Sequence, residues 1–598
     1  MALWKLLIES LQRLFRRLYF SQGKAFSRRV LRFTRSETLL IIIASMIGVV
    51  MGGVILLFNF VVEFAGEEFA LAFEMSRSME WWKYLLFPLI PGVGGLLVGV
   101  LQVYVFQTKP SHGVPEVILA SRFARGKLQK RTILSKILTA ALSIGSGGGG
   151  GREGPIIHLG GAVGYGISDV FRLTRDQSRT LIACGAAAGI SGIFNAPMGG
   201  VMFALEVILG DFRLKTFTPI VVSSVAATAL TRNFYGNNPL VNAPTGFSIG
   251  LQEYILFVAL GLLMGAVSAY FVYTNVSVER WCQRYLPKSP VFRPAIGGVL
   301  AGVLAAFLPR LMEQTYAPVN EALHSTLPIW ILLVVALLKP IHSGLTTGSG
   351  GTGGVFAPAL KSGAMLGSAF GMGAMALFPG MVTSPAAYAL CGMGAILAGT
   401  MHAPLTGVLI LVEITSDYSI ILPAMLTATL TSLIAQRLQK SSIYTWTLKM
   451  QGKSIGSYAY LPTMSEFAIE QIVERGVAHV TPNTPLRRVI QIFESTRHEA
   501  VLVLNEEQRY LGIIEFEDVR SFITETESVS SLLAADVMVT SIKPVTEETT
   551  LDVVIKLFDD YGWTVLPVVQ AEDTKRAVGL VTSADAHTFY RRSVAREI

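Results

Sequence analysis

Charged residues are scarce in this chain. Only 15% of its 598 residues are Asp, Glu, Lys or Arg, while 51% are hydrophobic, and a soluble domain contains about 25% charged residues. This deficit excludes an ordinary soluble protein of such length, and we expect much of the chain to face lipid. The formal net charge of +8 does not call for nucleic acid as a partner, because basic residues beside the first apolar run supply much of it.

Cysteine is scarce as well. The three cysteines are Cys184, Cys282 and Cys391, and they are scattered through apolar sequence. Their spacing matches neither a metal site nor a disulfide framework, so we expect all three to lie in the membrane core. The sequence also lacks a Gly-Lys-Ser/Thr ending after its two glycine-rich runs, which argues against a nucleotide phosphate loop.

Apolar runs of membrane-spanning length are present instead. They cover Leu39–Val62, Tyr84–Phe106, Ile255–Tyr273 and Ile421–Ala435. Other runs, such as Ile329–Leu338, are too short to cross a bilayer alone. These shorter runs predict broken or re-entrant helices, which are tolerated only where protein or a water-filled cavity covers the backbone.

The first 35 residues form a basic segment before the first apolar run. Basic flanks stay in the cytoplasm, so we expect a multi-pass protein of the plasma (inner) membrane with a cytoplasmic N-terminus. Leu3–Phe20 is typical of an amphipathic helix lying on the membrane face. The alternative is a basic tail without structure.

The chain repeats itself within its apolar part. A shift of 203 residues lays Gly145–Gly164 over Gly348–Gly367, and a shift of 207 lays Cys184–Val207 over Cys391–Ile414. Two matches at nearly one offset predict a duplicated half-domain, about 36–235 and 250–450, within a membrane domain of residues 36–450. Glycine-interrupted apolar segments at corresponding places of two repeats point to a transport site.

Each repeat contains a glycine loop followed by a proline, Gly145–Gly151 before Pro155 and Gly348–Gly354 before Pro358. Proline near a helix start costs no hydrogen bond, and glycine lets the backbone approach an ion closely. Helix N-termini bind anions with partial charges. The loops therefore predict two helices whose N-termini face one anion site. Glycines that serve only tight helix packing would leave Glu153 unexplained.

The composition changes after about residue 452, where acids become frequent and no segment could span a bilayer. We expect a linker at 451–465 and two soluble units at about 466–528 and 531–598. Both read as strand, helix, strand, strand, helix. The sequence thus predicts an α/β pair on the cytoplasmic side.

Three motifs resemble the anion-site motifs of the CLC chloride channel and transporter family: SHGVPEV (Ser111–Val117), GREGP (Gly151–Pro155) and GVFAP (Gly354–Pro358). The C-terminal pair resembles the CBS domains of many members. The resemblance implies an all-α polytopic fold with inverted repeats and broken helices, followed by an α/β CBS pair. It also implies a homodimer with a separate pore in each subunit.

The resemblance implies roles for individual residues. Glu153 matches the gating glutamate, whose carboxylate can mimic the anion and block its path; a structural ion pair with Arg152 is the alternative. Tyr444 matches the central tyrosine that faces the anion; a lone interfacial tyrosine is the alternative. The other residues expected at the anion site are Gly113, Arg152, Gly154, Val355, Phe356 and Ala357.

Two positions depart from the family pattern. His112 stands where many members have a serine that donates to the anion, which makes the anion preference and the pH response less certain; its ring could also turn away and leave a backbone N–H to serve. Val207 stands where proton-coupled members usually carry a glutamate, and valine cannot relay a proton. The adjacent Glu206 should point elsewhere, and we expect its repeat partner Glu413 to be structural.

The C-terminal pair has one good nucleotide motif. Thr582 and Asp585 lie in a Gly-x-x-Thr-x-x-Asp pattern, which in CBS pairs contacts ribose and phosphate. In the first unit Glu515 replaces the hydroxyl and would repel phosphate. We therefore expect one adenine nucleotide (ATP, ADP or AMP), or else a structural dimerisation module.

These observations favour a voltage- or pH-gated chloride channel, which passes anions passively and is not an enzyme. Its expected partners are chloride or a related anion, the lipid bilayer and a second copy of the chain. One alternative is a proton-coupled chloride exchanger that uses another proton route. A second alternative is a membrane-anchored nucleotide sensor with a dead pore, but the intact Glu153 and both glycine loops argue against it.

Overall fold

The computed structural model describes residues 37–597 except for 79–86, 109, 111–112, 123–127, 130, 172, 238, 313–315, 452–466, 497–498, 521, 523–530, 562 and 572–575. The predicted amphipathic helix at Leu3–Phe20 lies outside these residues. The chain divides into two compact units, Met1–Lys453 and Ser454–Ile598. Each unit is described by itself.

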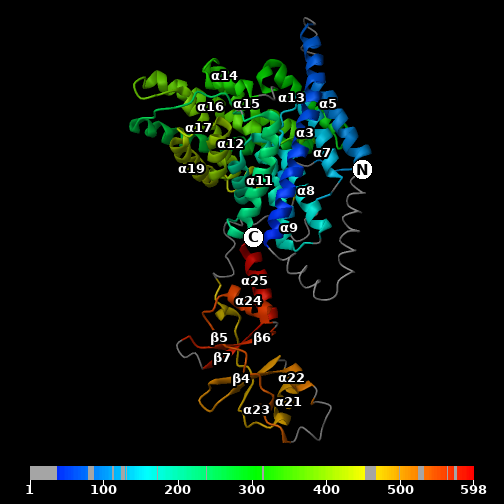
Figure 1. Ribbon diagram of the computed structural model, residues 1–598, viewed down its shortest axis with the longest axis vertical. Helices are drawn as coiled ribbons and strands as arrows, with labels where there is room; N and C mark the ends of the chain where they lie inside the picture. The colour runs from blue at the N-terminus through cyan, green and yellow to red at the C-terminus, as the bar shows by residue number, and fades with distance from the viewer. Residues whose placement is uncertain are drawn as a thin grey trace. The chain divides into compact units, whose positions relative to one another are not determined.

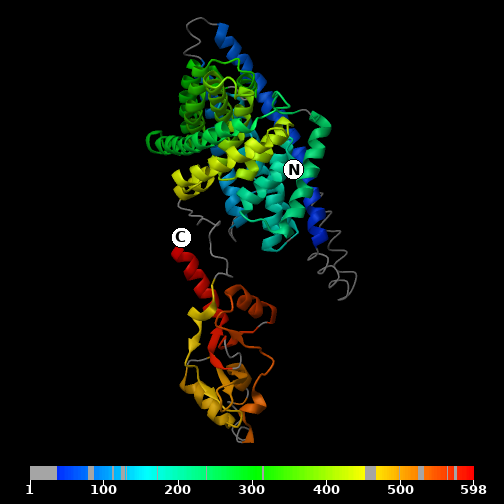
Figure 2. The ribbon, with the colours of Figure 1, turned by 90° about the vertical axis from the view of Figure 1, so that its left-hand side faces the viewer.

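The membrane unit consists of helices that cross one another at different tilts (Figures 1 and 2). Those of the first half are α3 (Glu37–Ser78), α5 (Leu89–Val100), η1 (Leu101–Val105), α6 (Val114–Arg122), α7 (Thr132–Gly145), α8 (Glu153–Val170), α9 (Arg175–Phe194), α10 (Pro197–Phe203), η2 (Ala204–Leu209) and α11 (Leu214–Tyr235). Those of the second half are η3 (Leu251–Glu253), α12 (Tyr254–Tyr285), α13 (Phe292–Phe307), η4 (Pro309–Leu311), α14 (Ala317–Leu323), α15 (Ile329–Gly348), α16 (Phe356–Leu377), α17 (Pro385–Met401), α18 (Pro404–Thr415), α19 (Ile421–Leu438) and α20 (Ile443–Met450).

Among the described residues, five helical segments are long and apolar enough to cross a membrane. One of them is α15, so the prediction that the run from Ile329 belongs to a helix too short to cross is wrong. The helix continues past Lys339 and through Pro340 to Gly348. It does so because these polar and small residues are buried against neighbouring helices, and the Lys339 ammonium donates to the carbonyl of Leu311. Shorter apolar helices such as α7 and α18 also occur, as the broken pattern predicted.

The duplication is visible in equivalent backbone details of the two halves. Asn195 and His402, which the shift of 207 residues superimposes, both end their helices in the left-handed conformation, with φ of 55° and 58°. In α8 and α9 the backbones meet at Gly160 and Gly185, where an added Cβ would strike the other helix. In α16 and α17 the corresponding pair is Gly363 and Gly392. The repeat therefore conserves close helix crossings and not only composition.

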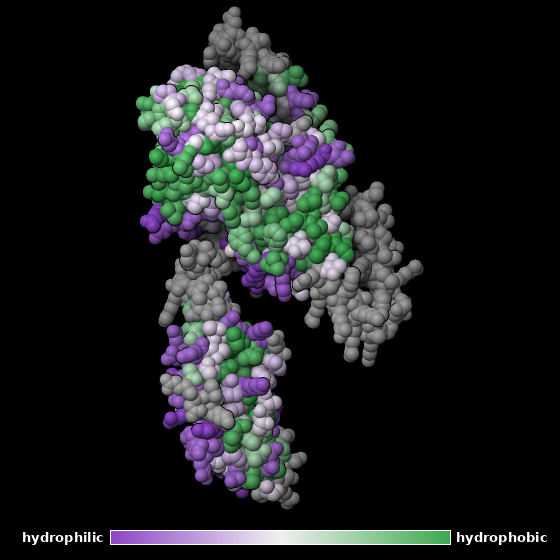
Figure 3. Space-filling view, turned by 60° about the vertical axis from the view of Figure 1, so that its left-hand side comes forward, coloured by the Kyte–Doolittle hydropathy of each residue, from purple (hydrophilic) through white to green (hydrophobic). Residues whose placement is uncertain are grey.

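Large apolar side chains cover much of the outer surface of the membrane unit. On one face they form a broad zone, with hydrophilic residues gathered toward its edges (Figure 3). Along α3, Val49, Leu57 and Phe60 are more than half exposed. Such a surface is typical of contact with lipid. The three cysteines are buried, as predicted.

The C-terminal unit contains two small sheets, with strand orders β1-β7-β6-β5 and β2-β3-β4. Its elements are η7 (Ile469–Ile472), β1 (Glu474–Arg475), β2 (His479–Val480), α21 (Leu486–Ser495), β3 (Ala500–Leu504), β4 (Tyr510–Glu515), α22 (Phe516–Arg520), α23 (Ala534–Val537), β5 (Val545–Thr546), α24 (Leu551–Tyr561), β6 (Val565–Val569), β7 (Ala577–Thr582) and α25 (Ser583–Glu597). Both halves follow the predicted order of strand, helix, strand, strand, helix. Each sheet joins one parallel and one antiparallel pair around its central strand, β3 or β6.

Candidate anion site between the two glycine loops

The two glycine loops lie side by side in the membrane unit. The N–H of Gly151 donates to the carbonyl of Gly354, and the N–H of Gly354 donates to the carbonyl of Gly151, both at 2.7 Å. The shift of 203 residues makes these two glycines equivalent. A reciprocal contact between equivalent residues is the mark of a two-fold relation, so the two halves face each other across this bridge.

Each loop leads directly into a helix. Glu153 is the first residue of α8, and Phe356 is the first residue of α16. Pro155 and Pro358 occupy the third position of their helices, as predicted. Both helices therefore direct free N–H groups and the positive ends of their dipoles toward the paired loops. This arrangement can hold an anion without a full positive charge that would retain it.

Glu153 is buried at this point, with an exposed fraction of 3%. Its side chain lies over Gly151, where an added Cβ would strike the Oε2 atom. This Oε2 atom is buried and has no hydrogen-bond partner among the described residues. A buried carboxylate oxygen without a partner is costly, and the cost falls when the group moves or binds a proton. Glu153 thus has the properties that a movable gate requires.

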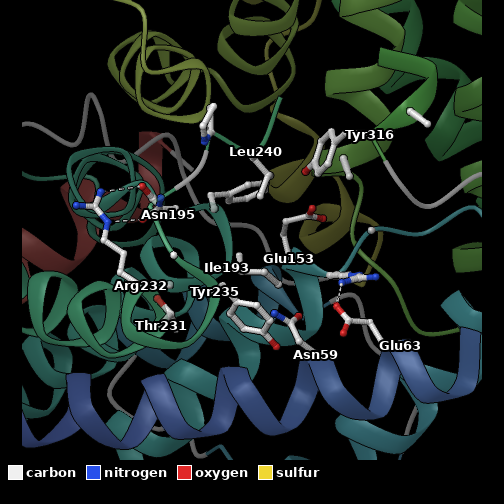
Figure 4. A pocket seen from close by; sticks show the side chains of 18 of the residues that line it. Asn59, Glu63, Glu153, Ile193, Asn195, Thr231, Arg232, Tyr235, Leu240 and Tyr316 are labelled. Atoms are coloured by element: carbon white, nitrogen blue, oxygen red, sulfur yellow. Dashed lines mark hydrogen bonds and ion pairs between the residues drawn. The ribbon is translucent and has the colours of Figure 1, made fainter. Parts of the chain in front are cut away.

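A cavity of about 550 Å³ opens beside Glu153. The Glu153 side chain points into it, toward Tyr316 (Figure 4). Arg152 lines the same cavity, and its guanidinium forms an ion pair with Glu63 of α3 at 3.7 Å. The ion pair that the structure places on Arg152 is therefore with Glu63 and not the alternative pairing with Glu153. Other lining residues that sequence reasoning missed are Asn59, Thr231, Tyr235 and Asn320.

In the first motif, the backbone of Gly113 lies against the backbone of Gly154 in the second motif. Gly113 has φ of +91°, and an added Cβ would strike the carbonyl of Gly154. The N–H of Gly113 donates to Oε2 of Glu116 at 2.7 Å, which fixes the start of α6. Glycine is needed here for both its conformation and its size. His112, the preceding residue, lies outside the described residues.

A second, narrow cavity of about 10 Å³ lies at the other loop. Gly354, Val355 and Tyr444 line it together with the start of α6. Tyr444 has an exposed fraction of 5%, and its hydroxyl lies 3.9 Å from Sδ of Met401. A tyrosine anchored in the membrane interface would be more exposed. Tyr444 instead stands beside the second loop.

The remaining predicted residues of the second loop lie at the same place. The Phe356 ring packs on the Phe194 ring, with centroids 4.8 Å apart. Ala357 lines the larger cavity with Gly151 and Glu153. The structure thus brings together every described residue predicted for the anion site, although their roles stay predictions.

Glu206 and Glu413 form a second reciprocal contact between the halves. Glu206 accepts from the N–H groups of Leu405 and Thr406 at 3.3 and 2.8 Å. Glu413 accepts from the N–H groups of Met198 and Gly199 at 2.9 and 2.7 Å. Each carboxylate thereby caps the first turn of a helix in the other half, in line with the structural role expected for Glu413.

Val207 is buried in η2, and its carbonyl accepts from the Arg122 guanidinium at 3.1 Å. Its isopropyl group cannot bind a proton, and the side chain of Glu206 is engaged in capping. The described part of this segment therefore offers no obvious carboxylate that could replace the missing relay.

In the C-terminal unit the predicted nucleotide residues lie at the start of α25. The Thr582 hydroxyl donates to Oδ2 of Asp585 at 2.7 Å, and the N–H of Asp585 donates to the Thr582 hydroxyl at 3.1 Å. Glu515 accepts from the Thr564 hydroxyl at 3.0 Å. Burial, together with the negative charges of Asp518 and Glu499, raises the pKa of Glu515, and the Thr564 hydroxyl partly opposes this shift. Bound nucleotide stays an untested prediction.

Both units of the chain are similar to known proteins. The family model described as voltage gated chloride channel matches residues 94–436, more than half of the chain, and the CBS domain model matches 469–525 and 534–590. A protein of Ralstonia nicotianae whose name describes it as a ClcB-like chloride channel protein is 34% identical over 359 residues, covering 59% of this chain and 82% of that protein. The H(+)/Cl(-) exchange transporter ClcA of Vibrio parahaemolyticus is 32% identical over 420 residues, covering 68% and 88%.

Among solved structures, a slow cyanobacterial Cl-/H+ antiporter matches with a TM-score of 0.64 and 27% identity, over 69% of this chain and 97% of that one. A eukaryotic CLC transporter matches over 91% of this chain with a TM-score of 0.58 and 21% identity, a likeness that concerns the fold. The predicted fold class is thereby confirmed. The chain belongs to the CLC family of voltage-gated chloride channels and their exchanger relatives, and it carries two C-terminal CBS domains.

Proposed function

We propose that this protein moves chloride across the membrane in exchange for protons. The observation that carries the proposal is the meeting of the α8 and α16 N-termini at the reciprocal Gly151–Gly354 bridge. Glu153 stands at this meeting point with a buried, unpartnered carboxylate oxygen. An anion and this carboxylate compete for the same positive helix ends, and protonation of the carboxylate removes it from the competition.

The relatives favour exchange over the passive channel that the sequence suggested. The ClcA relative is named an H(+)/Cl(-) exchange transporter, and the cyanobacterial neighbour is described as a Cl-/H+ antiporter. Val207 is the observation that favours the channel, since it removes the usual proton relay. The ClcB-like relative is named as a channel protein. Exchange in this chain therefore needs a proton route that does not pass through residue 207.

The proposed cycle uses the residues of the two cavities. Glu153 lies over the site when ionised, where it takes the place of an anion. A proton neutralises it, its attraction to the helix N-termini falls, and chloride occupies the backbone N–H groups of the loops. Return of Glu153 to the site displaces chloride and releases the proton. No bond to carbon forms or breaks, so the process is transport and not catalysis.

Reversal potentials of the purified protein in planar bilayers test the proposal. With a chloride gradient and no pH gradient, exchange should give a reversal potential short of the Nernst value for chloride, and this potential should move when the pH on one side is changed. A reversal potential at the Nernst value for chloride that ignores pH would establish the passive channel instead. Voltage gating would appear in the same recordings as a voltage-dependent current.

The C-terminal unit is proposed to be a cytoplasmic regulatory module that binds one adenine nucleotide at Thr582 and Asp585, and the whole chain is proposed to form a homodimer. Titration of ATP into the full-length protein, with Asp585→Asn as the control, should give binding that the variant weakens. Equal binding by both proteins would place the nucleotide away from Asp585, and no binding by either would leave dimerisation as the better role for this unit.

A further inference from the structure

Glu279 is the one acidic residue of the long apolar helix α12. Its exposed fraction is 4%, although it lies in a helix apolar enough to span a membrane. Buried ionisable groups on membrane-spanning helices are expensive, and they are by default candidates for ion or proton pathways. Glu279 belongs to none of the three family motifs that the sequence carries.

The packing of α12 against α15 places Glu279 at the mouth of the second glycine loop. An added Cβ at Gly348 would lie 2.6 Å from the Glu279 Cα, and one at Gly344 would lie 2.9 Å from the Val278 Cβ. These two glycines, one helical turn apart, let the two helices touch along this stretch. Because Gly348 begins the loop that ends at Gly354, the same contact brings Glu279 to the anion site.

Glu279 itself lines the narrow cavity at the second glycine loop. Glu279 and Asn275, which share one face of α12, line it together with Gly354, Val355 and Tyr444. Its volume of about 10 Å³ is about the space of one water molecule. Asn275 donates to the carbonyl of Pro340 at 3.3 Å, which holds this face of α12 in place.

The two cavities lie on opposite members of the glycine bridge. Gly151 and Glu153 line the larger one, and Gly354 and Glu279 line the narrow one. The helix α20, which carries Tyr444, ends at Met450, just before the chain leaves for the C-terminal unit. The narrow cavity therefore lies beside the last helix of the membrane unit.

The groups around Glu279 suit a carboxyl that changes its protonation. Gln283 donates from Nε2 to Oε1 of Glu279 at 3.2 Å, and an amide donor is compatible with a charged or a neutral acceptor. Charged and titratable groups that lie near this position include Cys282 on α12, Arg293 on α13 and Tyr444 on α20. Arg293 is held by a bond from Nε to the carbonyl of Ser349 at 3.0 Å.

We propose that Glu279 is the inner proton acceptor of this transporter, in place of the carboxylate that Val207 lacks. It takes a proton from water that reaches the α20 side of the narrow cavity and passes it, through a water molecule of that cavity beside Tyr444, to the carboxylate of Glu153. Glu279 returns to its ionised state, and only the proton has moved. This inference rests on the proposed exchange activity.

The test is chloride-driven proton transport by the full-length protein in proteoliposomes, with chloride flux measured in parallel. Glu279→Gln should keep chloride flux and lose uphill proton movement to the level of liposomes without protein. Glu279→Asp, which keeps a carboxylate, should retain proton movement. Glu206→Gln is the matched control, because it neutralises a membrane carboxylate that caps a helix, and it should retain coupling.

The outcomes separate the inference from the proposed function. If the wild-type protein moves no protons, the exchange activity itself is wrong. If the wild type exchanges and Glu279→Gln exchanges equally well, only the role of Glu279 is wrong. Loss of both fluxes in folded Glu279→Gln also overturns the role, since it makes the residue structural. If Glu279→Gln does not fold, Glu279→Met replaces it, and proton movement by a folded Glu279→Met protein overturns the proposal in the same way.

Discussion

The two glycine loops have the same backbone but different side chains at the decisive position. Residue 153 begins α8 and residue 356 begins α16, and the shift that superimposes the loops makes these two positions equivalent. One is a glutamate, and the other is a phenylalanine that packs on Phe194. The difference teaches that duplication supplied the loop backbone twice, whereas the carboxylate that we propose as the gate occurs in only one of the two loops.

In the CBS pair, too, the two units share a backbone arrangement but differ in the side chain at one equivalent position. Thr582 ends β7 and Glu515 ends β4, at equivalent places of the two units. Thr582 binds the Asp585 carboxylate, while Glu515 brings its own carboxylate to that position. In both parts of the molecule, a repeated fold presents two equivalent sites and single substitutions make them unequal.

Breaking the backbone bridge should have the largest effect. In Gly354→Ala the added Cβ would lie 2.5 Å from the Gly154 nitrogen and 3.0 Å from its Cα, and neither backbone atom can swing away. Overpacking of this kind costs about 1–3 kcal/mol, and it separates the two helix N-termini. We expect loss of chloride flux and a lower melting temperature in detergent.

The control for this change is Gly53→Ala on α3, where an added Cβ meets nothing within 4 Å. It should keep flux and melt at or above the wild-type temperature, because alanine favours a helix over glycine. Normal flux in Gly354→Ala would show that the bridge is dispensable.

Removing the gate should abolish coupling but spare the pathway. Glu153→Gln cannot ionise, so it no longer competes with chloride for the helix N-termini. Chloride flux in proteoliposomes should stay high and become insensitive to pH, and proton movement should cease. Glu63→Gln, which changes a carboxylate on the wall of the same cavity, should keep the pH response. A folded Glu153→Gln protein without any chloride flux would contradict the gate.

Much of this site could be predicted from the chain because it depends on local rules. A glycine run followed by proline specifies a loop and a helix start, and the two copies specify that the halves are equivalent. The reciprocal Glu206 and Glu413 caps follow the same repeat. The repeat does not predict that Gly151 pairs directly with Gly354, because the sequence of one loop does not specify which residue the loop contacts.

The residues that the sequence did not reveal come from elements outside the repeat motifs. Glu63 lies in α3 and Tyr316 just before α14, so both are far in sequence from the glycine loops although they line the larger cavity. Only tertiary packing brings them to it. The continuation of α15 through Pro340 was missed because its polar residues are satisfied only by other helices. Glu279 does have a signal in the sequence, because an acidic residue in a candidate membrane span indicates a functional role by default.

The paired caps offer a smaller, symmetrical test. Glu206→Gln and Glu413→Gln each remove one negative charge from a helix N-terminus while keeping an acceptor oxygen, which should cost about 1 kcal/mol. We expect similar decreases in melting temperature for the two variants, without a change in the ratio of chloride to proton movement. A change in that ratio for Glu206→Gln alone would give this residue a role in proton transfer that its twin lacks.

The smallest effect is expected at Glu515, in the CBS unit that departs from the nucleotide motif. Because burial raises the pKa of Glu515, its folded state binds a proton more tightly than the unfolded state does. Ionised Glu515 therefore lowers the free energy of unfolding above the raised pKa, and this penalty disappears as the pH falls through it. Glu515→Gln, which cannot ionise, should protect the amides of β4 more strongly at neutral pH, and the difference from wild type should shrink in acid. Hydrogen exchange of the full-length protein at matched pH values measures this, with the exposed Glu517→Gln as the control. Weaker protection of β4 in Glu515→Gln at neutral pH would mean that the bond from Thr564 outweighs burial, and that the charge stabilises this unit.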